Sequence, residues 1–311
     1  MPKLGEGNFG SKFGYQIDKK NDKVGFDDAT HTYFDLEDGS KYISVTTLIH
    51  NYTQPYDSDF WSSYKACEFL LGDGFYDLKK KLLSNKVWKN SYLEEYCIDK
   101  KQFISKKEEI LESYKIKNQE ACDRGTKIHE KLENLFYVKD EKHIRKYAGG
   151  GNFTVKQGDY RLDADRVIYP EFLISYEFDE YLKLSGQLDY LQIVDNQVVI
   201  RDWKTNKKID KESYYDRATK SKQKMKYPLS HLDDCNLVVY SLQLSTYAYM
   251  LEKIKPSLKI KHLYINHFDH DGNETEYECP YLKDEVIKML LHYRKINKSK
   301  MELDKDKPII F

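Results

Sequence analysis

The chain has 311 residues, and its 51 Lys and Arg residues balance 51 Asp and Glu residues, which gives a formal net charge of zero. A chain of this length forms one large domain or a core with an added lobe, and either can bury a substantial apolar interior. The sequence has no apolar run near the roughly 20 residues that a membrane span requires and no visible secretory leader at Met1, so we expect no membrane segment.

The cysteines indicate the cellular compartment. They are odd in number and far apart in the sequence: Cys67, Cys97, Cys122, Cys235 and Cys279. This favours reduced thiols in a cytoplasmic setting. The composition is rich in Lys, Tyr and Asn and poor in Ala, which is typical of an AT-rich genome. We therefore expect the cytoplasm of a bacterial or phage-infected cell.

The N-terminal part is expected to begin with a hairpin. Residues 30–35 alternate between polar and apolar side chains, a turn signal follows at residues 38–39, and residues 41–45 return. This pattern predicts two antiparallel strands. A helix should follow from Val45, with Ser44 as its cap.

The remaining elements are predicted by hydrophobic periodicity. Residues 58–118 carry apolar side chains at helical spacing among many charges, which predicts a helical insertion. The elements expected after it are helix 119–138, an irregular segment, strands 166–180, 182–194 and 197–204, helix 237–254, strands 259–269 and 275–279, and helix 283–297. This order predicts an α/β fold with an αβββαβ core around a mixed central sheet. We expect residues 1–118 to form a hairpin and helical lobe, and residues 119–311 to form the core domain.

Two acidic residues and a lysine should meet at the ends of two predicted strands. Asp189 lies on strand 182–194, while Asp202 and Lys204 share one face of strand 197–204 because they are two positions apart. An isolated Asp-x-Lys is most often a solvated strand end, but charges beside a buried strand are unfavourable without a function. A carboxylate pair supplies the oxygen ligands that Mg²⁺ prefers, and the lysine adds a mobile cation. The combination is typical of a metal-dependent nuclease.

Five signals follow one another along the chain. They are Arg124-Gly125-Thr126-Lys127-Ile128-His129, Glu171, Gly186-Gln187-Leu188-Asp189, Asp202-Trp203-Lys204-Thr205 and Gln243-Leu244-Ser245-Thr246-Tyr247. Over roughly residues 119–295 they resemble the RecB-like branch of the PD-(D/E)XK nucleases. With Ser44-Val45-Thr46-Thr47 upstream, the chain is most similar to mitochondrial genome maintenance exonucleases and phage exonucleases. Leu188 departs from the superfamily pattern, which has proline there, but the RecB-like branch tolerates this change.

The resemblance implies a restriction-endonuclease-like core that binds one or two Mg²⁺ or Mn²⁺ ions. The implied metal ligands are His129, Glu171, Asp189, Asp202 and the main-chain carbonyl of Trp203. Lys204 is the implied catalytic residue, together with Asp189 and Asp202, and it would orient the nucleophilic water and stabilise charge on the phosphate. An imidazole ligand would soften the site toward Mn²⁺.

Two assignments stay open at this point. Glu177 competes with Glu171 for the acidic position, and the alternative for His129 is a histidine packed in the core. Some RecB-like nucleases hold an iron–sulfur cluster through closely spaced cysteines near the C-terminus. This chain lacks that spacing, so we expect no cluster.

The resemblance also implies contacts with nucleic acid. The residues concerned are Arg124, Thr205, Lys207, Lys208, Gln243 and Tyr247. Gln243 and Tyr247 lie one turn apart on one helix face. They would support the active site or contact the DNA backbone, and the alternative is a half-buried polar face of a core helix.

A local excess of positive charge accompanies the Asp-Trp-Lys strand. Residues 201–226 contain ten Lys or Arg and four Asp or Glu, and such local charge attracts a polyanion even when the total charge is zero. Tyr214, Tyr215 and Tyr227 within this stretch suit base stacking on a single strand. The alternative is a solvated loop.

Two further patterns are weaker. Residues 5–10 match a nucleotide-binding glycine pattern, but no buried strand precedes them and no kinase motif follows, so we expect a mobile N-terminal segment. His262, His267 and His270 suggest zinc, but a solvated strand is favoured because no cysteine is nearby.

These features predict a Mg²⁺- or Mn²⁺-dependent DNA exonuclease that prefers single strands or ends. The alternatives are a RecB-like endonuclease or spacer-processing nuclease, and a non-catalytic DNA-binding scaffold with a nuclease fold. The intact Asp189, Asp202 and Lys204 argue against the scaffold. The expected partners are DNA and proteins of replication or recombination, with no membrane.

Overall fold

In a computed structural model of the chain, the described residues are 24–27, 30, 32–133, 135, 147–148, 162–163, 166–216 and 220–305. The glycine pattern at residues 5–10 and most of the irregular segment predicted before residue 166 lie outside these ranges. Among the described residues, every helix is too short or too polar to span a lipid bilayer.

Three strands come first, then a run of helices, then a run of strands, and helices and strands are mixed near the C-terminal end. Their order is β1 (Val24–Asp27), β2 (Thr32–Asp35), β3 (Lys41–Ser44), α2 (Val45–His50), α3 (Ser58–Leu71), the 3-10 helix η1 (Gly72–Phe75), α4 (Tyr76–Asn85), α5 (Ser91–Glu95), α6 (Lys100–Glu133), β4 (Tyr147–Ala148), β5 (Leu162–Asp163), β6 (Arg166–Asp179), β7 (Leu182–Val194), β8 (Gln197–Lys204), β9 (Tyr215–Asp216), β10 (Ser221–Lys222), α7 (Asn236–Ile254), β11 (Lys259–Phe268), β12 (Glu274–Glu278) and α8 (Lys283–Lys305). The expected hairpin, central strands and core helices are confirmed. The short strands β1, β4, β5, β9 and β10 have no counterpart in the predicted order.

The chain divides into two compact units. The core unit comprises residues 1–53, 127–212 and 224–311, and the helical unit comprises residues 54–126 and 213–223. The N-terminal hairpin lies in the core unit, because β3 pairs in parallel with β7. The expected division into domains at residue 118 stays a prediction.

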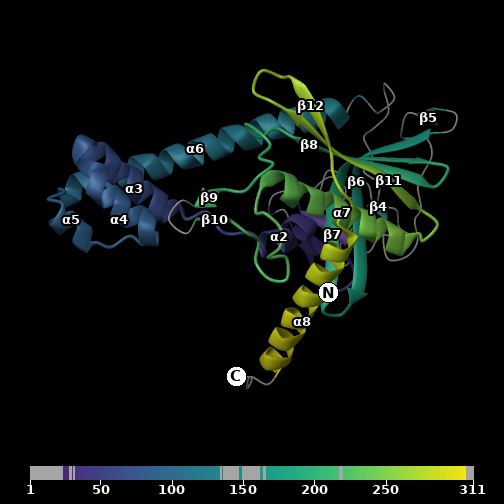
Figure 1. Ribbon diagram of the computed structural model, residues 1–311. Coiled ribbons are helices and arrows are strands. Elements are labelled where there is room, and N and C mark those ends of the chain that lie inside the picture. Colours follow the sequence, from purple (N-terminus) through teal and green to yellow (C-terminus); the bar gives the residue numbers. More distant parts are fainter. Residues whose placement is uncertain are drawn as a thin grey trace, which may run out of the picture. The chain divides into compact units, whose positions relative to one another are not determined.

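The core unit is built on a mixed sheet (Figure 1). Its strand order is β1-β2-β3-β7-β8-β11-β12, and β6 also pairs with β7. The strands β6, β7 and β8 are antiparallel, whereas β8 and β11 are parallel. Asp195 and Asn196 join β7 to β8 with φ angles of 48° and 61°, as a type I′ hairpin turn requires. The predicted α/β fold with a mixed central sheet is confirmed.

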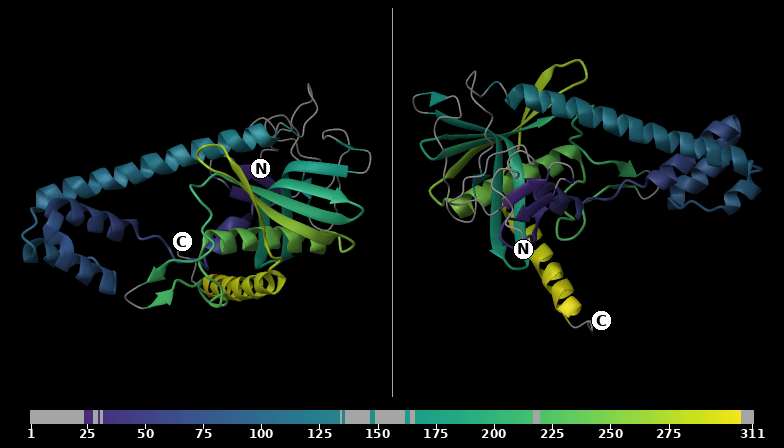
Figure 2. Two further views of the ribbon diagram at one scale, coloured as in Figure 1. Left: turned by 45° about the horizontal axis from the view of Figure 1, so that its top comes forward. Right: turned by 180° about the vertical axis from the view of Figure 1, so that it is seen from behind.

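The helix α7 is apolar over most of its surface and covers the sheet. Every residue from 241 to 248 is buried, and the helix packs against β6, β8, β11, α2 and α8. In the left view of Figure 2, α7 lies between the sheet and α8. Full burial of one large apolar side chain contributes about 1.5–3 kcal/mol. This packing therefore fixes the few polar side chains of α7 at defined positions against the sheet.

The helix α6 is longer than predicted. It begins at Lys100, well before the expected start at residue 119. Residues 100–118 contain neither proline nor glycine. Lys106 and Glu109, which lie one helical turn apart, form an ion pair at 2.8 Å. Such a sequence has high helix propensity, so nothing interrupts the helix before it reaches the core unit.

The helical unit has its own apolar core. Side chains from α3, η1, α4, α5 and the start of α6 form it, including Phe60, Phe75, Leu78 and Phe103. The predicted helical insertion is confirmed as secondary structure. The strands β9 and β10 form a small antiparallel hairpin that belongs to this unit.

Gly186 allows the ring of Tyr247 to lie directly against β7. A Cβ at residue 186 would lie 2.6 Å from Tyr247 Cε1, and Tyr247 is 3% exposed. We expect Gly186→Ala to lower the free energy of unfolding by about 1–3 kcal/mol, because the ring or α7 must move. Urea denaturation measures this change. Gly74→Ala is the matched control, since a Cβ there meets nothing within 4 Å, and equal midpoints for both variants would contradict the expectation.

Candidate active site

Glu171 and Asp189 lie opposite each other on neighbouring strands. In the antiparallel register of β6 and β7, Pro170 pairs with Tyr190 and Phe172 pairs with Leu188, so Glu171 and Asp189 are opposite each other. Both side chains are buried, at 5% and 7% exposure. Glu171 has a φ of 48°, a left-handed conformation that costs a non-glycine residue about 1–3 kcal/mol. Strain of this kind persists where the surrounding structure holds a residue in a functional position.

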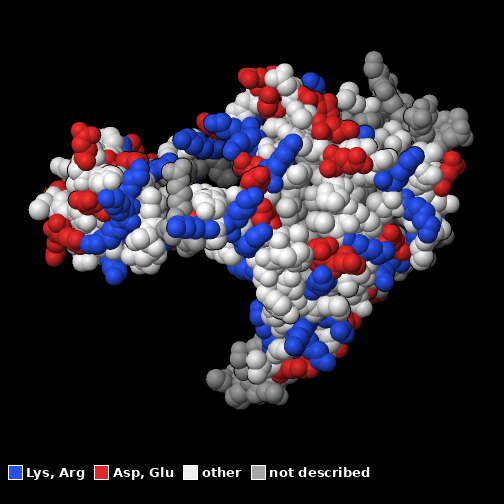
Figure 3. Space-filling model, viewed as in Figure 1, with Lys and Arg blue, Asp and Glu red and all other residues white. Residues whose placement is uncertain are grey.

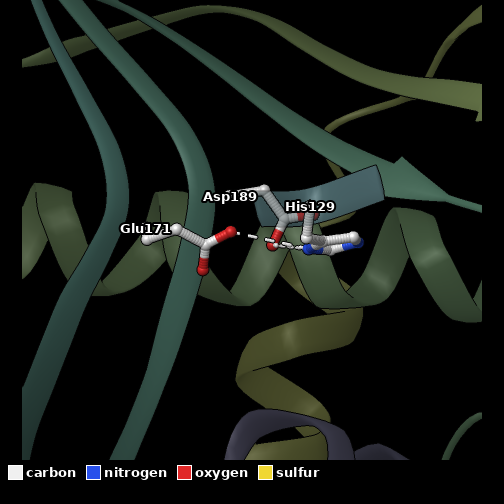
Figure 4. Close-up of side chains that lie close together, drawn as sticks. All are labelled: His129, Glu171 and Asp189. Carbon is white, nitrogen blue, oxygen red and sulfur yellow. Dashed lines mark ion pairs between the residues drawn. The ribbon is translucent and has the colours of Figure 1, made fainter. Parts of the chain in front are cut away.

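His129 on α6 completes a cluster with these two carboxylates (Figure 4). Its Nδ1 lies 3.5 Å from Glu171 Oε1 and 3.7 Å from Asp189 Oδ1. Each residue offers one ligand atom, and these atoms lie within 4.8 Å of one another. Within the described ranges, this is the one cluster of three or more His, Cys, Asp or Glu side chains that could share a metal ion.

The backbone of Trp203 connects this cluster to the end of β8. Its N–H donates to Asp189 Oδ2 at 2.6 Å. Its carbonyl oxygen lies 3.0 Å from His129 Nε2. Because a carbonyl oxygen only accepts, Nε2 must carry a proton. The other ring nitrogen faces two carboxylates, so the imidazole is held as a cation between them.

The pKa values reflect this crowding of acidic groups. Burial would lower the pKa of His129, but attraction to Asp189, Glu171 and Asp202 outweighs it and raises the value to about 10. Burial, with repulsion from Asp202 and Glu171, raises the pKa of Asp189 to about 8 despite attraction to His129 and Lys204. Without another cation, the cluster therefore retains protons that a metal ion would displace.

Lys204 stands in a network with Asp202 and Gln243. Its Nζ lies 2.6 Å from Asp202 Oδ2 and 3.4 Å from Gln243 Oε1. The Gln243 amide donates from Nε2 to Asp202 Oδ1 at 2.9 Å. Burial would lower the pKa of Lys204, but the carboxylates of Asp202 and Asp189 raise it. The ammonium group is therefore charged and held by two partners.

The donor set fits a divalent cation. Two carboxylates, an imidazole and a main-chain carbonyl are oxygen and nitrogen ligands that Mg²⁺ and Mn²⁺ accept. Glu171 Oε1 is buried and accepts no hydrogen bond from the part of the chain that the structure describes, which leaves an acceptor for a cation. Asp202 lies outside this cluster, and its carboxylate contacts Lys204 and Gln243. Its role as a metal ligand stays a prediction.

The sequence matches the family model of the PD-(D/E)XK nuclease superfamily over residues 76–295. The chain belongs to this superfamily. Among curated proteins, none matches it. Two solved structures are similar to this chain. The protein named SSO0001 is 15% identical, the match covers 42% of this chain and 50% of that chain, and the TM-score is 0.26. A protein from Eubacterium rectale described as "Putative exonuclease" is 11% identical, the match covers 83% of this chain and 79% of that chain, and the TM-score is 0.30. The chain thus spans half the length of SSO0001.

Members of the PD-(D/E)XK nuclease superfamily generally use divalent metal ions. The geometry favours Glu171 over Glu177 as an acidic ligand in this member of the superfamily. Glu177 is directed to the N-terminal hairpin, where it accepts a hydrogen bond from the Tyr42 hydroxyl at 2.5 Å. Glu171 lies beside His129 and Asp189. The alternative of an inert core histidine for His129 is likewise disfavoured by this cluster.

The predicted nucleic-acid contacts of this superfamily member differ in exposure. Gln243 is buried, at 7% exposure, and bonded within the active site, and Tyr247 is buried against Gly186. Their burial favours the supporting role over contact with DNA. Arg124 and Thr205 are half-buried. Lys207 and Lys208 are exposed, and Lys208 forms an ion pair with Asp210 at 2.6 Å.

The three histidines considered for zinc have other neighbours. His262 contacts Glu278 at 2.8 Å, and His267 is buried and donates from Nε2 to the carbonyl of Asn206 at 2.6 Å. His270 is exposed at the end of the same segment. This setting fits a strand with ordinary side-chain contacts.

Tyr240 is a neighbour of the active site that the sequence motifs do not contain. Lys204 Nζ lies 4.7 Å from the centre of its ring. Tyr240 precedes Gln243 by one turn on the same face of α7. The signal in the sequence is only this spacing, and it has meaning once α7 is known to pack on β8. The ring face attracts the ammonium group and restrains its position.

We expect Tyr240→Leu to lower kcat by about 2- to 30-fold with little change in KM, because a cation–π contact contributes about 0.5–2 kcal/mol. Tyr240→Phe retains the ring face and should keep most of the activity. Steady-state kinetics on a DNA substrate measures both variants. Equal losses in the two would contradict this role and assign it to the hydroxyl group.

Proposed function

We propose that this nuclease is a Mg²⁺- or Mn²⁺-dependent DNA exonuclease of the RecB-like branch, similar to mitochondrial genome maintenance and phage exonucleases, that prefers single strands or ends. The observation that carries the proposal is the convergence of His129, Glu171 and Asp189 beside the end of β8, where Lys204 lies. A cytoplasmic setting, partners in replication or recombination and a division into domains at residue 118 are parts of the same proposal.

The residues of the site have distinct roles in hydrolysis of a phosphodiester. His129, Glu171, Asp189, Asp202 and the Trp203 carbonyl would hold a divalent cation, whose charge would offset the charge that develops on the phosphate. The Trp203 N–H fixes the orientation of Asp189 through its hydrogen bond at 2.6 Å. Lys204 would donate to the phosphate or to the attacking water, and its contacts with Asp202 and Gln243 hold it in place beforehand.

The geometry of the lysine supports a catalytic role over a purely structural one. An ion pair alone needs only Asp202, yet Lys204 also has a buried amide and an aromatic ring arranged around it. Burying this many polar groups is unfavourable unless all are paired. A preorganised cation next to acidic ligands is what stabilises a phosphoryl transition state.

Cleavage of linear and circular single-stranded DNA of the same sequence tests the proposal. The DNA is end-labelled in the linear form, and each reaction contains Mg²⁺, Mn²⁺ or EDTA. We expect the wild-type protein to degrade the linear form only, with either metal ion and not in EDTA. Lys204→Ala should cleave the linear form about 10²- to 10³-fold more slowly. Lys298→Ala should cleave it normally, because the ion pair of Lys298 with Glu302 on α8 is exposed and belongs to neither the active site nor the predicted nucleic-acid contacts.

Cleavage of the circle would instead identify an endonuclease of the RecB-like type. Binding of DNA with no cleavage under any condition would favour a non-catalytic scaffold. Cleavage that continues in EDTA would contradict the assignment of the His129, Glu171 and Asp189 cluster to a metal ion.

A further inference from the structure

The β9–β10 hairpin of the helical unit has two different faces. Tyr215 pairs with Lys222 across its two strands, and Asp216 pairs with Ser221. Residues directly opposite in an antiparallel pair share a face, and successive residues of a strand point to opposite faces. Tyr215 and Lys222 therefore lie on one face, and Asp216 lies on the other.

The Asp216 face is attached to the helical unit. Lys86 at the end of α4 forms an ion pair with Asp216 at 2.7 Å, and its Nζ also lies 5.1 Å from the centre of the Tyr214 ring. A backbone hydrogen bond from Gln223 to the Tyr214 carbonyl at 2.8 Å extends the hairpin by one further rung. A two-stranded hairpin is marginally stable alone, so these contacts explain why it is ordered.

The opposite face presents an aromatic ring and positive charges to solvent. Tyr215 is 51% exposed, and its cross-strand neighbour Lys222 is exposed. Lys220 lies in the turn just before β10 and is exposed as well. The attachment through Lys86 does not require this ring, because Lys86 contacts the other face.

The structure separates the three tyrosines of the basic segment. Tyr214 faces Lys86. Tyr227 belongs to the core unit and lies edge-on to His292, with ring centroids 5.2 Å apart. Only Tyr215 combines a half-exposed ring with a lysine directly across the strand pair. Aromatic rings beside lysines are the means by which proteins bind single strands without sequence preference, through base stacking and phosphate contacts.

We propose that Tyr215, Lys220 and Lys222 form a platform that binds single-stranded DNA, with one base stacked on Tyr215 and the two lysines near the flanking phosphates. This inference rests on the proposed function, since DNA is the proposed substrate. The platform belongs to the helical unit, and none of its three residues is a proposed metal ligand or catalytic residue. Its role would therefore be to hold the strand and not to hydrolyse it.

Binding of a fluorescent oligothymidylate in EDTA, measured by anisotropy, tests the platform without cleavage. We expect Tyr215→Ala to weaken binding roughly 5- to 100-fold and Tyr215→Phe to retain it, as stacking needs the ring and not the hydroxyl group. Lys222→Ala should reduce the slope of log K against log salt by about 0.7, the value for one phosphate contact on a single strand.

The matched control is Tyr76→Ala. Tyr76 is also an exposed tyrosine of the helical unit with a lysine over its ring, at 63% exposure and 4.0 Å from Lys80 Nζ, but it is not on the hairpin. Its variant should bind as the wild-type protein does. Thermal denaturation shows whether each variant is folded.

Unchanged binding by folded Tyr215→Ala would overturn the platform, even if the protein degrades DNA as proposed. Equal weakening by Tyr76→Ala would also overturn it, because the effect would not be specific to the hairpin. Tyr215-dependent binding with no cleavage in Mg²⁺ or Mn²⁺ would support the platform and reject the exonuclease. The two proposals therefore fail separately.

Discussion

Lys204→Ala is expected to lower kcat by about 10²- to 10³-fold while DNA affinity changes little, because removal of one preorganised donor to a developing charge has an effect of this size. The lysine is held by Asp202 at 2.6 Å and by Gln243 at 3.4 Å, so the ammonium group needs little rearrangement as the reaction proceeds. Single-turnover cleavage of linear single-stranded DNA measures the loss of rate, and anisotropy in EDTA measures affinity.

A second variant separates catalysis from stability. Lys204→Ala leaves the carboxylate of Asp202, which is 2% exposed, without its cation, and a buried unpaired charge destabilises a protein. Lys204→Gln retains a donor for Asp202 but has no charge. It should therefore fold and remain nearly inactive. Wild-type kcat in Lys204→Gln would contradict a catalytic role for the charge. Lys298→Ala, which removes an exposed lysine of α8, serves as the control for loss of a lysine.

The central elements could be predicted because their patterns are strong and local. Apolar strands joined by Asp195-Asn196 and a helix apolar on most of its surface leave few alternatives. The predicted start of α6 at residue 119 differs from the observed start at Lys100. Neither a stop nor a start signal separates residues 100–118 from the residues that follow, so a boundary at 119 has no basis in the sequence. The strands β9 and β10 are two residues each, too short to produce a periodic pattern.

The site shows the same division between local and long-range information. The sequence motifs predict His129, Asp189 and Lys204 as site residues, but the choice between Glu171 and Glu177 depends on packing. Both glutamates lie on β6. They differ because α6 brings His129 close to Glu171, whereas the Tyr42 hydroxyl donates a hydrogen bond to Glu177. The contact of Tyr240 with Lys204 likewise depends on the packing of α7 against β8, which a single sequence does not contain.

The basic segment after β8 illustrates a different limit. Its charge excess over residues 201–226 is visible in the sequence, yet charges of both signs are interspersed over the face of the molecule in Figure 3. Part of the excess is also used internally, since Lys224 pairs at 2.6 Å with Asp233, which lies outside this segment. Counting charges therefore overestimates the basic surface that a strand would meet.

Asp189→Asn is expected to abolish metal-dependent cleavage and to weaken divalent-cation binding at least about 100-fold, because it removes a charged ligand from the cluster. Asparagine has nearly the same shape, and its side-chain oxygen can still accept the hydrogen bond from the Trp203 N–H. The substitution therefore removes charge without creating a cavity. Isothermal titration calorimetry with Mn²⁺ measures the loss of binding independently of cleavage.

The same variant should be as stable as the wild-type protein, or more stable, when no metal ion is present. Burial and the neighbouring carboxylates raise the pKa of Asp189 to about 8, so its ionised form is unfavourable in the folded protein, and asparagine is neutral. Replacement of a whole buried ion pair by apolar groups is often neutral or stabilising by about 1–4 kcal/mol, whereas removal of one partner leaves the other charge unpaired. Here we expect about 0–2 kcal/mol, because His129 loses one of its two carboxylate partners.

Thermal denaturation with and without Mn²⁺ combines both expectations. At about 100 times its Kd, a bound ion stabilises the folded wild-type protein by about 2.7 kcal/mol, and this increase should be absent in Asp189→Asn. Glu177→Gln is the matched control, because Glu177 bonds to Tyr42 outside the cluster, and it should keep the full increase. If Asp189→Asn kept the increase and Glu177→Gln lost it, the acidic ligands of the site would have to be reassigned. An inactive but stable Asp189→Asn would show that the carboxylates are maintained for ion binding at the expense of stability.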